Sequence, residues 1–200
     1  MTVIGITGPS GAGKGAVSKI LNEKYGFPVI DADKVYHSLV SSPSDCLEEI
    51  RKSFGDGVID KHGALDRREL AKIVLGEENG ENLMLLNSIT HKYVVAEIRK
   101  MLITLKSSAP VCVIDAPLLI EAGLCNDCTF TLSVIADKSV RAERISARDG
   151  ISPSAAITRI NSQKKDDFYL QNTDHSVTNN TDIESLSLSV ERILSERRVI

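Results

Sequence analysis

The sequence lacks several features that would assign it to a specialised class of proteins. It has no apolar run of the about 18 residues that a membrane helix needs, and no secretory signal pattern opens it. Positive charge is not in excess, because 24 Lys and Arg residues stand against 27 Asp and Glu residues, a formal net charge of -3. We therefore expect a cytoplasmic protein that binds neither membranes nor nucleic acid, and the sequence leaves its oligomeric state open.

Cysteine is too sparse to form a framework of disulfides or metal ligands. The four cysteines include one C-x-x-C pair, Cys125 and Cys128, without a second pair or paired histidines. We expect all four to be reduced thiols.

Segments with the apolar pattern of strands alternate with segments of helical spacing. Strands are expected at residues 2–7, 28–31, 111–114, 130–135 and 175–178. Helices are expected at residues 16–26, from 34 onward, at 44–54, 66–75, 81–106, 138–148 and 152 to about 165, and after a capping box at 181–184. We expect the apolar stripe of the 81–106 helix to lie in the core. The alternation predicts an α/β fold with a parallel sheet in three layers.

The first strand runs into a glycine-rich loop that fits G-x-x-x-x-G-K. The predicted phosphate-binding positions are Gly8, Gly11, Ala12, Gly13, Lys14, Gly15 and Ala16. Backbone amides of such a loop converge on phosphate oxygens, the following helix adds its positive end, and Lys14 can reach the β- and γ-phosphates. The loop therefore predicts an ATP-binding P-loop NTPase fold, with a purely structural glycine turn as the alternative.

The loop departs from its motif at the position that should bind magnesium. Gly15 and Ala16 stand where a Ser or Thr hydroxyl normally ligates Mg2+. Asp115, at the end of an apolar strand, is the carboxylate predicted to hold the metal, and a strand-end turn residue is its alternative reading. We expect Mg2+ binding that is weaker or altered.

A second carboxylate and two arginines complete the predicted chemistry. Asp33 follows the 28–31 strand and is the candidate base for the acceptor hydroxyl, although a helix N-cap is the competing reading. Asp31 is structural or metal-linked. Arg144 and Arg148 share one helix face and are the arginines best spaced to offset phosphoryl charge, ahead of Arg141 and Arg159.

The order of these motifs resembles the dephospho-coenzyme A kinase family over nearly the whole chain. The segments that carry the resemblance are Ile6 to Gly15, Val29 to Asp33, Gly63 to Leu70, His91, Pro117 to Glu121, Arg144 to Asp149, Arg159 to Gln163 and Val177 to Asn180. Three positions depart from the family pattern, at Gly15-Ala16, at Lys92 and at Asn180-Thr181.

The resemblance implies transfer of the ATP γ-phosphoryl group to the ribose 3'-hydroxyl of dephospho-coenzyme A, with Mg2+. It makes Asp33 the base and an acceptor contact, and it places Arg144 on the phosphates. Thr7, Arg67, His91, Pro117 and Leu118 become further substrate-side positions. The implied parts are a core of residues 1–34, 107–137 and 170–200, a helical acceptor-binding region of residues 35–106 and a helical lid of residues 138–169.

Two other functions remain open from the sequence. The same fold could serve a different nucleoside or nucleotide kinase, because fold alone does not fix the acceptor. The missing loop hydroxyl also allows a diverged protein that binds nucleotide or coenzyme A as a sensor without catalysis.

Overall fold

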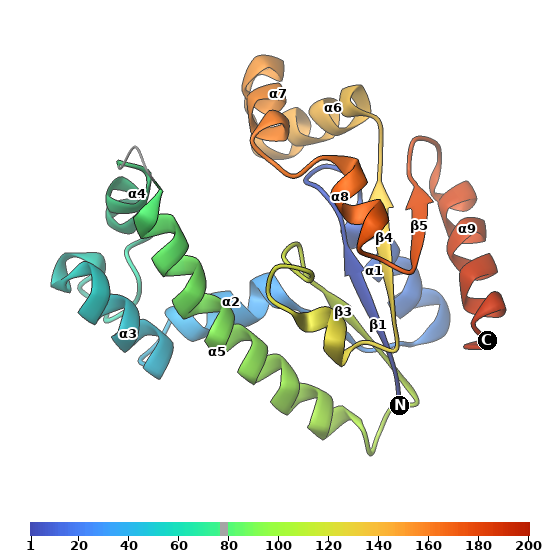
Figure 1. The fold of residues 1–200 in the computed structure, drawn as a ribbon, viewed down its shortest axis with the longest axis horizontal. Helices are drawn as coiled ribbons and strands as arrows, with labels where there is room; N and C mark the ends of the chain where they lie inside the picture. The colour runs from blue at the N-terminus through green and yellow to red at the C-terminus, as the bar shows by residue number, and fades with distance from the viewer. Residues whose placement is uncertain (77–79) are drawn as a thin grey trace. The chain divides into compact units, whose positions relative to one another are not determined.

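A computed structural model describes residues 1–76 and 80–200. The chain divides into two compact units, a first unit of residues 1–30 with 104–200 and a second unit of residues 31–103. Figure 1 follows the chain through both. Within the described ranges, no helix is both long and apolar enough to span a membrane.

A five-stranded sheet in the order β2-β3-β1-β4-β5 organises the first unit. The strands are β1 (Thr2–Thr7), β2 (Val29–Asp31), β3 (Val111–Asp115), β4 (Phe130–Ile135) and β5 (His175–Thr178). The central strand β1 pairs in parallel with β3 and β4, and β4 pairs in parallel with β5. The register sets Ile6 opposite Asp115, so the ends of β1 and β3 lie at the same edge. This confirms the predicted α/β fold.

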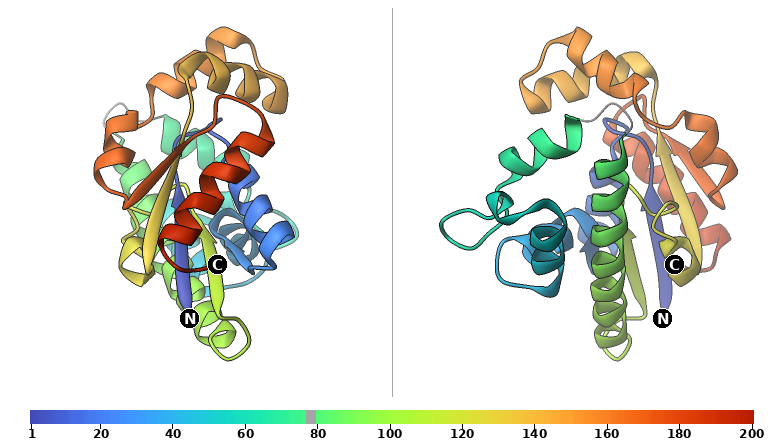
Figure 2. Two further views of the ribbon diagram at one scale, coloured as in Figure 1. Left: turned by 90° about the vertical axis from the view of Figure 1, so that its right-hand side faces the viewer. Right: turned by 60° about the vertical axis from the view of Figure 1, so that its left-hand side comes forward.

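The helices of the first unit are α1 (Lys14–Tyr25), α6 (Lys138–Asp149), α7 (Pro153–Asn161), α8 (Asp166–Gln171) and α9 (Ile183–Glu196), with a 3-10 turn η2 (Leu124–Asp127). Of these, α1, α8 and α9 pack against strands of the sheet, whereas α6 and α7 pack on each other through a separate apolar cluster. Figure 2 shows α1 and α9 side by side, and their buried residues Leu21 and Val190 belong to one core with Ile4 and Val134. Burial of these apolar side chains is the main force that fixes α1 behind the glycine-rich loop.

The second unit is helical. It contains α2 (Ala32–Val40), α3 (Asp45–Phe54), the 3-10 turn η1 (Asp56–Val58), α4 (Arg67–Leu75) and α5 (Glu81–Leu105), whose last residues lie beyond the unit's boundary. Side-chain caps start its short helices: Ser44 accepts a hydrogen bond from the amide of Leu47, and Asp66 accepts from the amides of Arg68 and Glu69. Leu47, Ile50, Leu70 and Ile89 are among the residues of its own core.

Three of the expected elements differ from the structure. The helix expected from 152 to about 165 ends at Asn161, and α8 is a separate helix, because the connecting segment turns toward the glycine-rich loop. Asp182 caps α9 in place of the expected Thr181, since its carboxylate accepts from both the amide and the hydroxyl of Ser185. The α5 stripe is only partly core: Ile98 is fully buried, whereas Met101 is 37% exposed.

Candidate active site

The loop between β1 and α1 has the backbone conformation that its glycines permit. Gly13 has a φ of 100° and forms the N-cap of α1 without a side chain. A Cβ at Gly13 would collide with the amide group of Asn179, which itself donates from Nδ2 to the carbonyl of Ala12 at 2.8 Å. Only glycine at this position therefore leaves room for Asn179, which is 6% exposed, to hydrogen-bond the loop.

Lys14 places its charge on the loop. Its Nζ donates to the carbonyl oxygen of Gly8 at 2.8 Å and to that of Pro9 at 3.4 Å. Lys14 is also the first residue of α1, so the positive end of the helix adjoins the same loop that the ammonium crosses. Both features favour binding of an anion such as a phosphate chain.

Gly15 leaves open space where the motif would place a hydroxyl. A Cβ added there would meet no atom within 4 Å, and the backbone is not in the left-handed region. A serine at this position would fit without a clash.

A hydroxyl that the sequence interpretation missed lies one helical turn further along α1. Ser18, which is 7% exposed, donates from Oγ to Asp115 Oδ2 at 2.6 Å. The helical spacing between Gly15 and Ser18 was the only signal in the sequence that could have indicated it. Ser18 thus fixes the carboxylate that ends β3 against α1.

The donor set around Asp115 fits a magnesium ion held mainly by substrate. Kinase sites hold Mg2+ through one or two carboxylates together with water and substrate phosphates. The described parts of the chain contain no group of three or more His, Cys, Asp or Glu side chains that could hold a metal. Asp115 is a single half-buried carboxylate beside the loop helix. It is therefore compatible with a kinase site in which substrate phosphates and water supply most of the metal ligands.

Arg144 on α6 contacts the glycine-rich loop directly. One guanidinium nitrogen, Nη1, donates to the carbonyl of Asn179 at 2.9 Å and makes longer bonds to the carbonyls of Ala12 and Gly11, at 3.4 and 3.5 Å. Backbone carbonyls are weaker partners than a phosphate oxygen for a guanidinium, because a phosphate is charged. Arg144 is therefore positioned at the loop with contacts that phosphates can replace.

Arg148 has different partners from Arg144. Its guanidinium binds the carboxylate of Asp149 through Nε at 2.7 Å and Nη2 at 3.0 Å, and Arg159 pairs with the same carboxylate. These hydrogen bonds, led by the one from Arg148, lower the pKa of Asp149 to about 2. Although Arg144 and Arg148 share a helix, only Arg144 has a described contact with the loop.

Thr7 links the end of β1 to the segment after β3. Its side chain is fully buried and donates from Oγ1 to the carbonyl of Pro117 at 3.1 Å. Leu118, the next residue along, is 42% exposed. The hydrogen bond holds the Pro117 turn against β1 and leaves Leu118 accessible.

Asp33 lies in the second unit, in the first turn of α2. The N-cap of that helix is Asp31, whose Oδ1 accepts from the amide of Lys34 at 3.0 Å. The capping role considered for Asp33 therefore belongs to Asp31, and the carboxylate of Asp33 is exposed.

Arg67 and His91 also belong to the second unit. Arg67 opens α4 and lies over the ring of Tyr36, 6.0 Å from its centroid, and it contacts the imidazole of His37. The sequence interpretation named neither aromatic neighbour. His91 lies half-buried on α5, away from the ends of that helix.

The cysteines lie in surroundings that disfavour their thiolates. Burial raises the pKa of Cys46 and Cys112 to about 11 and that of Cys128 to about 12, and it also raises the pKa of Cys125. Thiol groups of this kind are poor nucleophiles and poor metal ligands at neutral pH.

Comparison with known proteins places this site in a family. The family model described as Dephospho-CoA kinase matches residues 2–185. A dephospho-CoA kinase of Fusobacterium nucleatum subsp. nucleatum is 38% identical over 190 residues, which cover 95% of each chain.

Solved structures share the same fold. The crystal structure of TT1252 from Thermus thermophilus superposes with a TM-score of 0.80 at 29% identity, covering 98% of this chain and 97% of that one. A dephospho-CoA kinase from Campylobacter jejuni has a TM-score of 0.70 at 24% identity, covering 97% and 96%, and this likeness supports the fold alone. With the family model matched along nearly the whole chain, this protein belongs to the dephospho-CoA kinase family.

Proposed function

We propose that this protein transfers the γ-phosphoryl group of ATP to the ribose 3'-hydroxyl of dephospho-coenzyme A, giving coenzyme A and ADP. The observation that carries the proposal is the family match over residues 2–185. The geometry of the glycine-rich loop supports it, because Lys14 Nζ reaches back to the carbonyl of Gly8. This activity would make it a cytoplasmic enzyme of the last step of coenzyme A synthesis.

The phosphate chain of ATP would bind to the loop amides and the start of α1. Lys14 would exchange its bonds to the Gly8 and Pro9 carbonyls for the β- and γ-phosphates, which are stronger partners because they are charged. Arg144 would exchange its carbonyl contacts in the same way and offset the charge that develops on the transferring group.

We assign the proton-accepting role to Asp33. The acceptor oxygen attacks the γ-phosphorus, the bond from that phosphorus to the β,γ-bridging oxygen breaks, and the hydroxyl proton passes to the Asp33 carboxylate. Asp31, two residues earlier in the chain, caps α2 and supports a rigid backbone at the proposed base. Arg67, His91 and the Pro117-Leu118 turn are proposed as acceptor-side positions.

Mg2+ is proposed as the metal, and when bound it would neutralise charge on the β- and γ-phosphates. Asp115 would hold it, directly or through water, in the orientation that Ser18 fixes. We propose a core of residues 1–34, 107–137 and 170–200, an acceptor-binding region of residues 35–106 and a lid of residues 138–169.

ADP release in the presence of ATP and Mg2+ tests the proposal against the two other functions. We expect turnover with dephospho-coenzyme A and none with AMP or adenosine. Asp33→Asn should abolish most of it, whereas Asp45→Asn, an exposed acid in the first turn of another helix, should not. Turnover on AMP or adenosine instead would indicate a different kinase, and ATP binding without turnover on any acceptor would indicate a sensor.

A further inference from the structure

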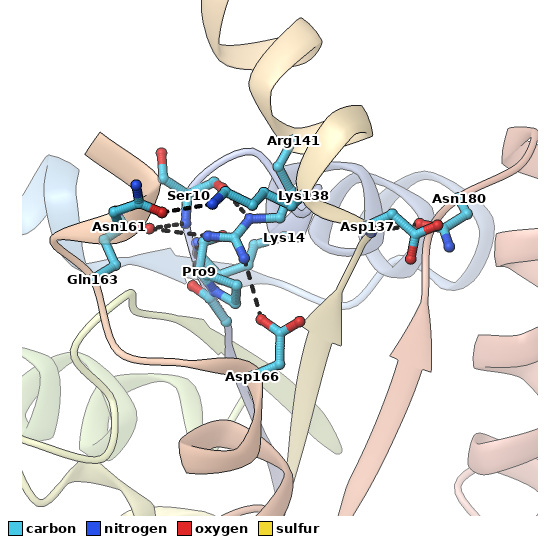
Figure 3. Close-up of polar contacts among 11 residues, drawn as sticks. Pro9, Ser10, Lys14, Asp137, Lys138, Arg141, Asn161, Gln163, Asp166 and Asn180 are labelled. Carbon is cyan, nitrogen blue, oxygen red and sulfur yellow. Dashed lines mark hydrogen bonds and ion pairs between the residues drawn. The ribbon is translucent and has the colours of Figure 1, made fainter. Parts of the chain in front are cut away.

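Arg141 on α6 is a buried arginine directed at the glycine-rich loop. Only 4% of it is exposed, and its guanidinium donates in three directions. Nε bonds the carbonyl of Ser10 at 3.0 Å, Nη1 bonds Asp166 Oδ1 at 3.1 Å, and Nη2 bonds Gln163 Oε1 at 3.3 Å. Figure 3 shows the guanidinium between these three residues.

Gln163 holds the same loop residue from its other side. Its Oε1 accepts a hydrogen bond from the amide of Ser10 at 3.0 Å, in addition to the one from Arg141. The N–H and the C=O of Ser10 are therefore both bonded to side chains from outside the loop. Arg141, Gln163 and Ser10 form a closed ring of hydrogen bonds (Figure 3).

Burial of a guanidinium is costly, so its partners indicate what the charge is used for. Burial lowers the pKa of Arg141, and the charge of Asp166 opposes that effect. An apolar side chain of similar size could pack α6 against the loop without this cost. A planar guanidinium, in contrast, bonds a backbone carbonyl, a carboxylate and an amide oxygen through three separate nitrogens. An apolar residue cannot donate at all, and lysine would have to reach all three acceptors from a single nitrogen.

The backbone of α6 also approaches the loop closely. A Cβ on Gly11 would lie 2.7 Å from the carbonyl oxygen of Arg141, so this approach requires glycine. Arg144, one turn further along the same helix face, bonds the carbonyls of Gly11 and Ala12. Helix α6 thus contacts three consecutive residues at the centre of the loop.

We propose that Arg141 and Gln163 are positioning residues, which hold the peptide groups of Ser10 so that the loop amides are preset for phosphate. Asp166 orients Arg141 by accepting its hydrogen bond, so a residue far from the loop in the sequence influences the affinity of the loop for phosphates. This inference rests on the proposed binding of ATP at the loop. It adds that the affinity for phosphates is set in part by the buried contacts of Arg141 and Gln163 with Ser10, two side chains that act on the loop and not on the nucleotide itself.

The test measures ATP affinity by calorimetry in EDTA, which separates the loop from the metal. Arg141→Lys and Gln163→Ala should each weaken ATP binding about tenfold or more, as expected for the loss of hydrogen bonds that involve a charged group. Arg192→Lys and Gln171→Ala, exposed residues on α9 and α8, serve as matched controls and should leave the affinity unchanged.

Hydrogen exchange at the Ser10 amide distinguishes positioning from simple stabilisation. Gln163→Ala should speed exchange of this amide about tenfold or more, while the amide of Leu21 in α1 stays protected. Gln163→Glu keeps the acceptor oxygen and should retain the protection. Lower melting temperatures with unchanged ATP affinity and unchanged Ser10 exchange would overturn the inference. Failure of the unaltered protein to bind ATP would refute the proposed function instead.

Discussion

The hydrogen bond between Ser18 and Asp115 leads to a prediction about magnesium. Ser18→Ala removes the buried hydroxyl that donates to Asp115 Oδ2 at 2.6 Å, and Asp115 loses this hydrogen bond. A hydrogen bond to a charged group contributes about 1.5–3 kcal/mol, and 1.4 kcal/mol corresponds to about a tenfold change in an equilibrium constant. Because Asp115 is the carboxylate proposed to hold the metal, that loss should fall on metal-dependent binding.

The quantity to measure is the ratio of ATP affinities with saturating Mg2+ and with EDTA. We expect Ser18→Ala to lower this ratio about tenfold and to leave the affinity in EDTA unchanged. Ser189→Ala, which removes a helix serine that donates only to a backbone carbonyl, is the matched control. An unchanged or larger ratio would refute the reasoning, because it would mean that Ser18 either has no effect on the metal or competes with it.

Three further predictions follow from the described contacts. Gly15→Ser should lower the Mg2+ concentration needed for half-maximal activity, because the added side chain meets no atom within 4 Å; an unchanged requirement in a magnesium titration would contradict this. Asp31→Ala should lower the free energy of unfolding by about 1 kcal/mol in urea titrations, since a cap is lost, whereas Asp33→Ala should not. The folded-state pKa of Asp149 is lowered to about 2, so its ion pairs stabilise the fold above the ordinary pKa of 3.8 and lose that effect as the pH falls through 2. Asp149→Asn should therefore lower the melting temperature at pH 6 and have little effect near pH 2, and an equal effect at both would contradict the assignment.

Local patterns in the sequence predicted most of the elements correctly. Apolar runs between polar residues predicted the five strands, and the strand-loop-helix context of the glycine-rich loop predicted its backbone. Those features depend on neighbours in the chain, which a single sequence displays directly.

Features that depend on distant contacts were not predictable in the same way. Helix α7 ends at Asn161, and shortly after it Gln163 accepts a hydrogen bond from the amide of Ser10, which lies far away in the chain. The Ser18–Asp115 bond likewise joins two elements that only the sheet brings together.

The sequence also did not show which of two nearby polar residues would be the N-cap of a helix. Asp31 and Asp33 both precede or open the same helix, and the backbone geometry at β2 decides that Asp31 is the cap. Asp182 replaces Thr181 at α9 for a similar reason. In both cases a shift of one or two residues changes which side chain reaches the first helical amides.

The product formed from dephospho-coenzyme A tests the central claim most directly. Incubation with ATP and Mg2+ followed by phosphorus NMR and mass spectrometry should reveal one added phosphate, as a monoester on the ribose 3'-oxygen, with an equal amount of ADP. A phosphate at another position, or unmodified dephospho-coenzyme A alongside ATP that binds the protein normally, would contradict the account.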